Sequence, residues 1–181
     1  MELNHAYNEK ANTTLLLDIS QLLYAREYLY EGNFHSNLHT HNHTEIFYVT
    51  EGLGSFLFNM NSCNVSKGCV LVINGNVPHT EVSSKEKPLR YIVLGIKGIE
   101  NLEHQRDNED FILINNQDSN LLSLFKCLVR EFSTDNPISK QICSYLTKSI
   151  LLKLSNRIEF MPEPLKYDTQ KGSKECAATC G

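Results

Sequence analysis

The stretch that decides the fold occupies residues 39–54 and reads HTHNHTEIFYVTEGLG. Residues two apart in an extended strand point to the same side, so His39 and His41 share one face and Glu45 has the same parity. A further histidine, His79, follows a proline some way along the chain. Imidazole and carboxylate groups are ligands that Zn, Ni, Mn and Fe accept, so this set predicts a site for one divalent metal ion.

The same four side chains also allow an interpretation without metal. A buried Glu45 can accept hydrogen bonds from neighbouring imidazoles, and the group is then a satisfied polar cluster. His43 has the same strand parity but falls in the bulge expected just before Glu45, which favours a solvated turn residue over a fifth ligand. A register built on His41 and His43 leaves only one residue before Glu45 and is disfavoured. The sequence leaves the metal site and the polar cluster both open.

Short apolar segments separated by turn residues surround this stretch. Residues 45–50 are aromatic and β-branched, and they stop at a turn that contains Gly52 and Gly54. Residues 69–73 are apolar throughout, which is typical of a strand covered on both faces. Strands this short and evenly spaced predict an all-β barrel or sandwich within residues 1–98. The remaining strands are expected at residues 15–19, 21–30, 55–59, 63–66, 79–82 and 89–96.

The second half of the chain changes to helical periodicity. Residues 99–117 are mostly polar and are expected to be a connecting segment. Asp118 is suited to cap a helix, and a second helix is expected at 138–158, so that residues 118–160 form a hairpin. One interpretation buries the apolar stripe of the second helix against the barrel. The other makes it a dimer interface, formed by Leu146, Ile150 and Leu154.

A barrel of this size holds one small molecule in its interior. In the segment QLLYAREYLY, Tyr24, Arg26 and Tyr28 share one face of the expected strand. If that face lines the interior, Arg26 would bind a carboxylate or phosphate through paired hydrogen bonds. If the face points outward, Arg26 is a solvated surface residue. Three further side chains are expected either to form apolar walls for the ligand or to belong to the plain core: Phe47, Val49 and Tyr91.

The overall composition fits a soluble globular domain with a small appendage. Of the 181 residues, 41% are apolar and 21% are charged. The net charge of −4 argues against nucleic-acid binding through a broad basic surface. No apolar run approaches membrane-spanning length, and no cleavable export signal opens the chain. The six cysteines form no C-x-x-C pair, so reduced thiols and a cytoplasmic location are expected.

The spacing His-x-His-x3-Glu-x6-Gly at residues 39–52 resembles the first motif of the cupin family. The second cupin motif is matched only in part. Gly68 and His79 have the expected separation, but Asn74 and Asn76 stand where the enzymes have Pro and Gly. The cupin resemblance implies a small β barrel, and in the enzymes of that family a catalytic metal. The weakened second motif counts against the enzyme.

The run from His39 to Gly54 is also similar to the sensing domains of AraC-type transcriptional regulators. In those domains H-x-H-x3-E-I-x-Y-V-x-E-G-x-G is typical, and each fixed position of this pattern is present here. A two-helix hairpin after the barrel is a further shared feature. The resemblance implies a small-molecule effector in the barrel, a homodimer, and DNA contact through two helix-turn-helix units. The sequence ends before such units would fit, so residues 161–181 are expected to be a polar linker toward a DNA-binding part that this sequence lacks.

We therefore expect a mainly β fold, α+β overall, in which a small cupin barrel precedes a helical hairpin. The expected function is effector sensing and dimerisation for a transcription regulator, without catalysis and without contact with a membrane. The alternative is a metal-dependent cupin enzyme of the dioxygenase or isomerase type, which the intact first motif favours. No cofactor other than the one divalent ion is expected.

Overall fold

The computed structural model describes residues 16–32, 34–101, 111–115, 118–134 and 136–163. In chain order the elements are β1 (Gln21–Leu29), β2 (Thr44–Glu51), β3 (Leu53–Phe58), β4 (Ser62–Ser66), β5 (Cys69–Ile73), β6 (His79–Ser83), β7 (Arg90–Lys97), β8 (Ile99–Asn101), β9 (Phe111–Asn115), α3 (Ser119–Phe132), α4 (Pro137–Leu154) and β10 (Phe160–Pro162). No helix in the described part of the chain has the length and apolar character needed to cross a membrane.

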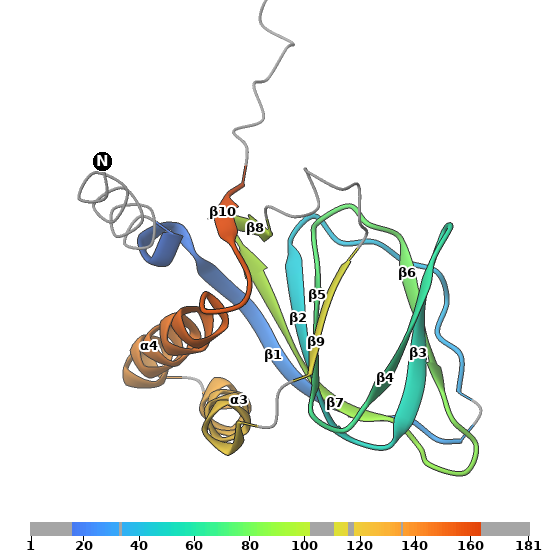
Figure 1. The fold of residues 1–181 in the computed structure, drawn as a ribbon. Helices are drawn as coiled ribbons and strands as arrows, with labels where there is room; N and C mark the ends of the chain where they lie inside the picture. The colour runs from blue at the N-terminus through green and yellow to red at the C-terminus, as the bar shows by residue number, and fades with distance from the viewer. Residues whose placement is uncertain (1–15, 33, 102–110, 116–117, 135, 164–181) are drawn as a thin grey trace, which may run out of the picture.

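Two antiparallel sheets face each other and form a barrel (Figure 1). The larger sheet has the order β1-β7-β2-β5-β9, and the smaller has the order β4-β3-β6. Single bridge pairs of His35 with Val82 and of His39 with His79 lay the segment 34–41 beside β6. The predicted β barrel is therefore confirmed, and with the two helices the fold is α+β.

Strand β2 shows how the sequence places the two faces of the larger sheet. Every residue from Thr44 to Thr50 is buried, because β2 lies between β7 and β5 and is covered on both faces. Phe47 and Val49 pack inside the barrel. Ile46 and Tyr48 belong to the core on the outer face, where the Tyr48 ring lies 5.3 Å from the ring of Phe125 on α3. Odd-numbered residues of β2 thus point inward, and this parity directs Glu45 into the barrel.

Helices α3 and α4 cover the outer face of the larger sheet (Figure 1). Asp118 caps α3 by accepting a hydrogen bond from the Asn120 amide, and Asn136 caps α4 by accepting one from the Ser139 amide. Pro137 stands in the first turn of α4, where its missing N–H costs nothing. The predicted cap at Asp118 is confirmed.

The apolar stripe of α4 is occupied within the chain itself. Ile150 is 0% and Leu154 is 1% exposed, and Leu146 is half-buried against the same core. Side chains that are covered by their own chain have no surface left for a second copy. The prediction of Ile150 and Leu154 as dimer contacts is therefore wrong, and the alternative interpretation of this stripe as core is confirmed.

Two further expectations differ from the structure. Residues 16–19 are helical rather than extended, with a hydrogen bond from the Ser20 amide to the Leu16 carbonyl, because a five-residue apolar run carries no periodicity that separates helix from strand. The expected connecting segment 99–117 contains β8 and β9, and β9 pairs with β5 at the edge of the larger sheet. Of the expected linker 161–181, only residues 161–163 are described, and they continue from Phe160 in β10, which pairs with β8.

Candidate metal and effector site

Four predicted ligands meet at one end of the barrel. One donor atom from each of His39, His41, Glu45 and His79 lies within 4.8 Å of the others. Glu45 Oε2 is 3.0 Å from His79 Nε2, and Glu45 Oε1 is 3.6 Å from His41 Nε2. Glu45 and His79 are buried, whereas His39 and His41 are half-buried. The sequence spacing thus predicted correctly that these four side chains converge.

Backbone contacts fix the orientation of two of the imidazoles. His79 Nδ1 lies 2.9 Å from the carbonyl oxygen of Val77, and His39 Nδ1 lies 2.8 Å from that of Asn37. A carbonyl oxygen can only accept, so each Nδ1 carries the proton and donates it. In the neutral imidazole, Nε2 then has a free lone pair and is the atom available to a metal ion.

Two buried polar atoms of the cluster depend on each other. Glu45 Oε2 and His79 Nε2 face each other at 3.0 Å, and neither atom has a hydrogen-bond partner outside this pair in the described part of the chain. A lone pair opposite a carboxylate oxygen is repulsive unless a proton or a cation lies between them. The donor set of three imidazoles and one carboxylate therefore fits a divalent ion such as Zn, Ni, Mn or Fe.

The charges of the cluster are coupled. Burial alone would raise the pKa of Glu45, but His79 and the hydroxyl of Tyr24 oppose it, and the pKa of this carboxyl lies below its usual value. Burial would lower the pKa of His79, but Glu45 reverses the effect and the pKa is raised. For His41, burial outweighs the attraction of Glu45 and lowers the pKa, which keeps this imidazole neutral.

Tyr24 of β1 and His43, just before β2, extend the cluster. The Tyr24 hydroxyl donates a short hydrogen bond to Glu45 Oε1, and His43 Nε2 lies 3.0 Å from the same hydroxyl oxygen. Burial, followed by the nearby Glu45 charge, raises the pKa of Tyr24, so this phenol stays protonated and remains a donor. His43 lies in the expected bend before β2 and is not one of the four converging residues, but it is half-buried and reaches Tyr24, so it is not fully solvated. Strand parity alone could have indicated this, since His43 shares the parity of Glu45.

The predicted ligand-binding residues fall into two groups. Phe47, Val49 and Tyr91 are at most 1% exposed and pack together in the barrel core, so the alternative of plain core describes them. Tyr24 and Tyr28 are half-buried at the side of that core. Arg26 shares their face of β1 but is exposed. Its guanidinium lies 5.4 Å from the centre of the Tyr24 ring and its Nη1 lies 3.4 Å from the Tyr28 hydroxyl. The interpretation of Arg26 as a buried anchor is therefore wrong, because β1 is an edge strand and leaves this side chain in solvent.

Glu81 is a second buried carboxylate in the barrel, and the sequence reasoning missed it. It is 3% exposed on β6, accepts a short hydrogen bond from the Ser36 hydroxyl, and accepts another at 3.2 Å from the Tyr91 hydroxyl. Tyr91 in turn lies 2.9 Å from Tyr30 through the two hydroxyl oxygens. Glu81 stands two residues after His79 in a strand, so their common parity was the signal that could have placed it inside.

Comparison with known proteins agrees with this architecture. Residues 22–147 match the model of the AraC-like ligand binding domain family. No curated protein matches the sequence. Among solved structures, an apo variant of ToxT from Vibrio cholerae strain SCE256 is similar with a TM-score of 0.57 and 15% identity, over 73% of this chain and 55% of that chain.

Two ligand-bound ToxT structures are similar to the same degree. Wild-type ToxT of strain SCE256 with an unsaturated fatty acid has a TM-score of 0.55 and 13% identity, over 76% of this chain and 55% of that chain. ToxT of Vibrio cholerae O395 with (E)-4-(8-methylnaphthalen-1-yl)but-3-enoic acid has a TM-score of 0.51 and 12% identity, over 76% and 57%. The chain thus spans just over half the length of these ToxT chains, and the similarity concerns the fold. Because the family model covers most of the described barrel and hairpin, the chain belongs to the AraC-like ligand binding domain family.

Proposed function

We propose that this chain is the effector-sensing and dimerisation part of an AraC-type transcription regulator, acting together with a DNA-binding part. The observation that carries the proposal is the buried Glu45–His79 pair in the barrel, whose facing atoms Oε2 and Nε2 have no hydrogen-bond partner outside the pair among the described residues. Buried polar groups without partners are costly, so a cation or a polar ligand that satisfies them is favoured at this place. Residues beyond β10 would connect the barrel to the DNA-binding part.

The proposed effector is a carboxylic acid with an apolar body. The two ligands named for ToxT, an unsaturated fatty acid and an arylbutenoic acid, are both of this class. In this chain Arg26 offers an exposed guanidinium beside the aromatic rings of Tyr24 and Tyr28. A guanidinium binds a carboxylate through two parallel hydrogen bonds, and the neighbouring rings suit the apolar part of the acid.

A divalent ion, when bound by His39, His41, Glu45 and His79, would supply a Lewis-acidic centre for an effector oxygen. The protein contributes the orientation of the imidazoles, through the backbone contacts of His39 and His79, and a neutral His41. Tyr24 holds one carboxylate oxygen of Glu45 in place.

Binding of palmitoleate tests the effector class. The measurement is thermal unfolding at increasing palmitoleate concentration, below the concentration at which it forms micelles. At a hundredfold excess over its dissociation constant, a ligand of the folded state adds about 2.7 kcal/mol to the free energy of unfolding. Arg26→Ala should weaken binding about tenfold or more, whereas Arg130→Ala, an exposed arginine on α3, should leave it unchanged. Equal binding by both variants, or no stabilisation of the wild type, would contradict the proposed effector class.

For the dimer, we propose the outer face of α4 in place of its buried stripe. Ile138, Ile142, Tyr145 and Leu152 are 73%, 39%, 61% and 45% exposed. Their spacing of four, three and seven residues is that of the a and d positions of a coiled coil. Ile138 and Leu152 each stand seven residues from Tyr145, so an antiparallel two-fold pairing at Tyr145 would bring Ile138 against Leu152 of the partner subunit. This symmetry makes a second copy the occupant that the stripe fits.

Glu81 supports a second candidate, a metal-dependent enzyme. A second buried carboxylate in the same barrel could act as a general acid or base beside a metal-bound substrate. Oxygen uptake by the Fe-loaded protein, with candidate apolar acids as substrates, tests this candidate. Turnover that Glu81→Gln abolishes would favour the enzyme over the sensor.

A further inference from the structure

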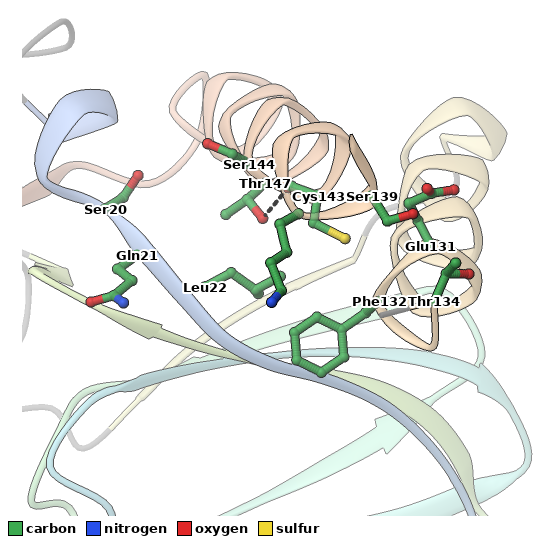
Figure 2. A pocket seen from close by; sticks show the side chains of 11 residues that line it. Ser20, Gln21, Leu22, Glu131, Phe132, Thr134, Ser139, Cys143, Ser144 and Thr147 are labelled. Carbon is green, nitrogen blue, oxygen red and sulfur yellow. Dashed lines mark hydrogen bonds between the residues drawn. The ribbon is translucent and has the colours of Figure 1, made fainter. Parts of the chain in front are cut away.

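A groove lies outside the barrel, between the start of β1 and the helical hairpin (Figure 2). Its volume is about 520 Å³, which lies within the range of 300–1,000 Å³ of small-molecule pockets. The lining comes from β1, from the end of α3 and from the first half of α4. The lining residues do not include the four histidine and glutamate ligands or the residues of the barrel core. The groove is therefore a separate place from the site described above.

Three apolar side chains line part of the groove, among polar and charged neighbours. Leu22 of β1, Phe132 of α3 and Cys143 of α4 line it, and their side chains point toward a common space in Figure 2. Phe132 is 39% exposed, so a large ring stands at the rim without full cover. An apolar ligand that covers the Phe132 ring and the Cys143 thiol would remove their unfavourable contact with water.

Ser139 provides a hydrogen-bond donor beside these apolar side chains. The residue is 3% exposed and lines the groove, and its hydroxyl makes no hydrogen bond to any described residue. Thr147, also in the lining, differs because its hydroxyl is already used by the carbonyl of Cys143 at 2.8 Å. The Ser139 oxygen is not among the fully buried atoms that lack a partner, so it is open to the groove, where an acceptor on a ligand can replace water.

The charges around the groove select neither an anion nor a cation. Glu131 and Lys140 both contribute to the lining, and their opposite charges leave no net preference for an anion or a cation. The volume suits a molecule of small-drug size and is too small for a helix or a second copy of the chain.

We propose that the groove between β1, α3 and α4 is a second small-molecule site, which binds a neutral ring compound carrying a carbonyl acceptor. The ring packs on Leu22, Phe132 and Cys143, and the carbonyl oxygen accepts a hydrogen bond from Ser139. The proposed binding in this groove does not depend on whether the barrel binds a carboxylic acid.

A coumarin dye tests the proposal. The probe is 7-(dimethylamino)-4-methylcoumarin, a neutral ring compound with a lactone carbonyl and environment-sensitive fluorescence. For its roughly fifteen non-hydrogen atoms, a dissociation constant on the order of 100 μM is expected. Ser144→Phe places a ring in the groove and should weaken binding at least about tenfold. Ser123→Phe makes the same change on the exposed face of α3, outside the lining, and should leave binding unchanged.

If the phenyl ring of Ser144→Phe disturbs folding, a smaller change in the groove provides the test. Ser139→Ala removes the hydroxyl while its backbone amide keeps the cap contact with Asn136. The loss of one hydrogen bond predicts about three- to tenfold weaker binding. No binding by the wild type up to about 1 mM, or unchanged binding in both groove variants, would overturn the proposal.

The cysteines of the chain report where the probe binds. Cys143 lines the groove, Cys63 and Cys69 belong to the barrel core, and Cys127 is exposed on α3. Burial raises the pKa of Cys143, so alkylation by iodoacetamide is followed at about pH 9 by peptide mass spectrometry. Saturating probe should slow alkylation of Cys143 severalfold and leave Cys127 unchanged. Protection of Cys63 and Cys69 without protection of Cys143 would place the probe in the barrel and overturn the proposal.

Discussion

The carboxylate oxygen Oε2 of Glu45 and the nitrogen Nε2 of His79 lie 3.0 Å apart in the barrel, and neither has a hydrogen-bond partner outside this pair within the described residues. The other ring nitrogen of His79 is held by the Val77 carbonyl, so the ring cannot turn away without losing that bond. The protein thus holds a lone pair and a carboxylate together, an arrangement that a shared proton or a metal ion stabilises.

The first prediction concerns metal binding by this pair. After incubation with Zn²⁺ and dialysis, the wild-type protein should retain about one zinc ion per chain. The His79→Ala variant should bind zinc about a hundredfold or more weakly and lose the ion on dialysis. His35→Ala is the matched control, because His35 is exposed and lies outside the four-ligand set. Elemental analysis and calorimetric titration check the difference. If His79→Ala and His35→Ala retain equal zinc, Glu45 and His79 form a polar cluster and not a metal site.

The second prediction concerns the pH dependence of stability in the metal-free protein. Because the pKa of Glu45 is lowered in the folded protein, this carboxylate stabilises the fold at pH values above the pKa of Glu in the unfolded chain. The stabilisation is lost as the pH falls through the pKa of Glu45 in the folded protein. Because the pKa of His79 is raised in the folded protein, this imidazolium stabilises the fold at pH values below the pKa of His in the unfolded chain. The stabilisation is lost as the pH rises through the pKa of His79 in the folded protein. The pair is therefore strongest between these values, near about pH 5.5.

Urea unfolding in the presence of a chelator measures this effect. His79→Gln should lower the free energy of unfolding more at about pH 5.5 than at about pH 8.5. His35→Gln serves as the control for removal of an exposed imidazole. A cost of His79→Gln that is the same at both pH values would show that the charged pair does not form.

The sequence predicted the parts of this molecule that local periodicity controls. The run 39–54 placed three of the four candidate ligands together because strand parity and one turn determine their directions, and the partial second motif added His79. It could not place Ile150 and Leu154, because an apolar stripe fits both a core and an interface until the packing partner is known. Arg26 and Glu81 illustrate the same difficulty in strands. Arg26 is exposed because β1 is at the edge of its sheet, beside β7. Glu81 is buried because the segment 34–41 covers β6. In both cases the neighbouring segment is distant in the sequence, so local periodicity does not reveal it.

The third prediction concerns Thr44, which joins the site to the end of the described chain. Its buried hydroxyl donates to the Ile99 carbonyl at 2.6 Å, and Ile99 belongs to β8, the partner of β10. Thr44→Val removes the donor and leaves the Ile99 carbonyl unsatisfied, at a cost of about 1–3 kcal/mol. Hydrogen exchange of the β8 and β10 amides should become faster. Thr50→Val breaks a comparable bond to the Arg90 carbonyl at the other end of β2, and it should leave these amides unchanged.

The fourth prediction concerns the turn between β2 and β3. Gly52 has a φ of +80°, and a Cβ built there would lie 1.9 Å from the Pro88 carbonyl oxygen. Gly52→Ala should therefore lower the free energy of unfolding by at least about 2 kcal/mol, from backbone strain and the clash together. Gly75 is the control, since its φ is not positive and the nearest atom to a Cβ lies at 3.1 Å. Denaturant unfolding of both alanine variants checks the order, and a larger loss at Gly75 would contradict it.

The last prediction tests the outer face of α4 as the dimer interface. In an antiparallel pairing at Tyr145 the two copies of this residue face each other across the two-fold axis, so their Cα atoms would come within the range of about 4.4–6.8 Å that a disulfide bridges. Tyr145→Cys, in a background where the other exposed cysteines are serine, should form a covalent dimer under mild oxidation. Lys140→Cys is exposed on the opposite side of the same helix, away from the stripe, and it should stay monomeric on non-reducing gels. Equal dimer yields from both variants would indicate random collision and would remove the outer face of α4 as the contact between copies.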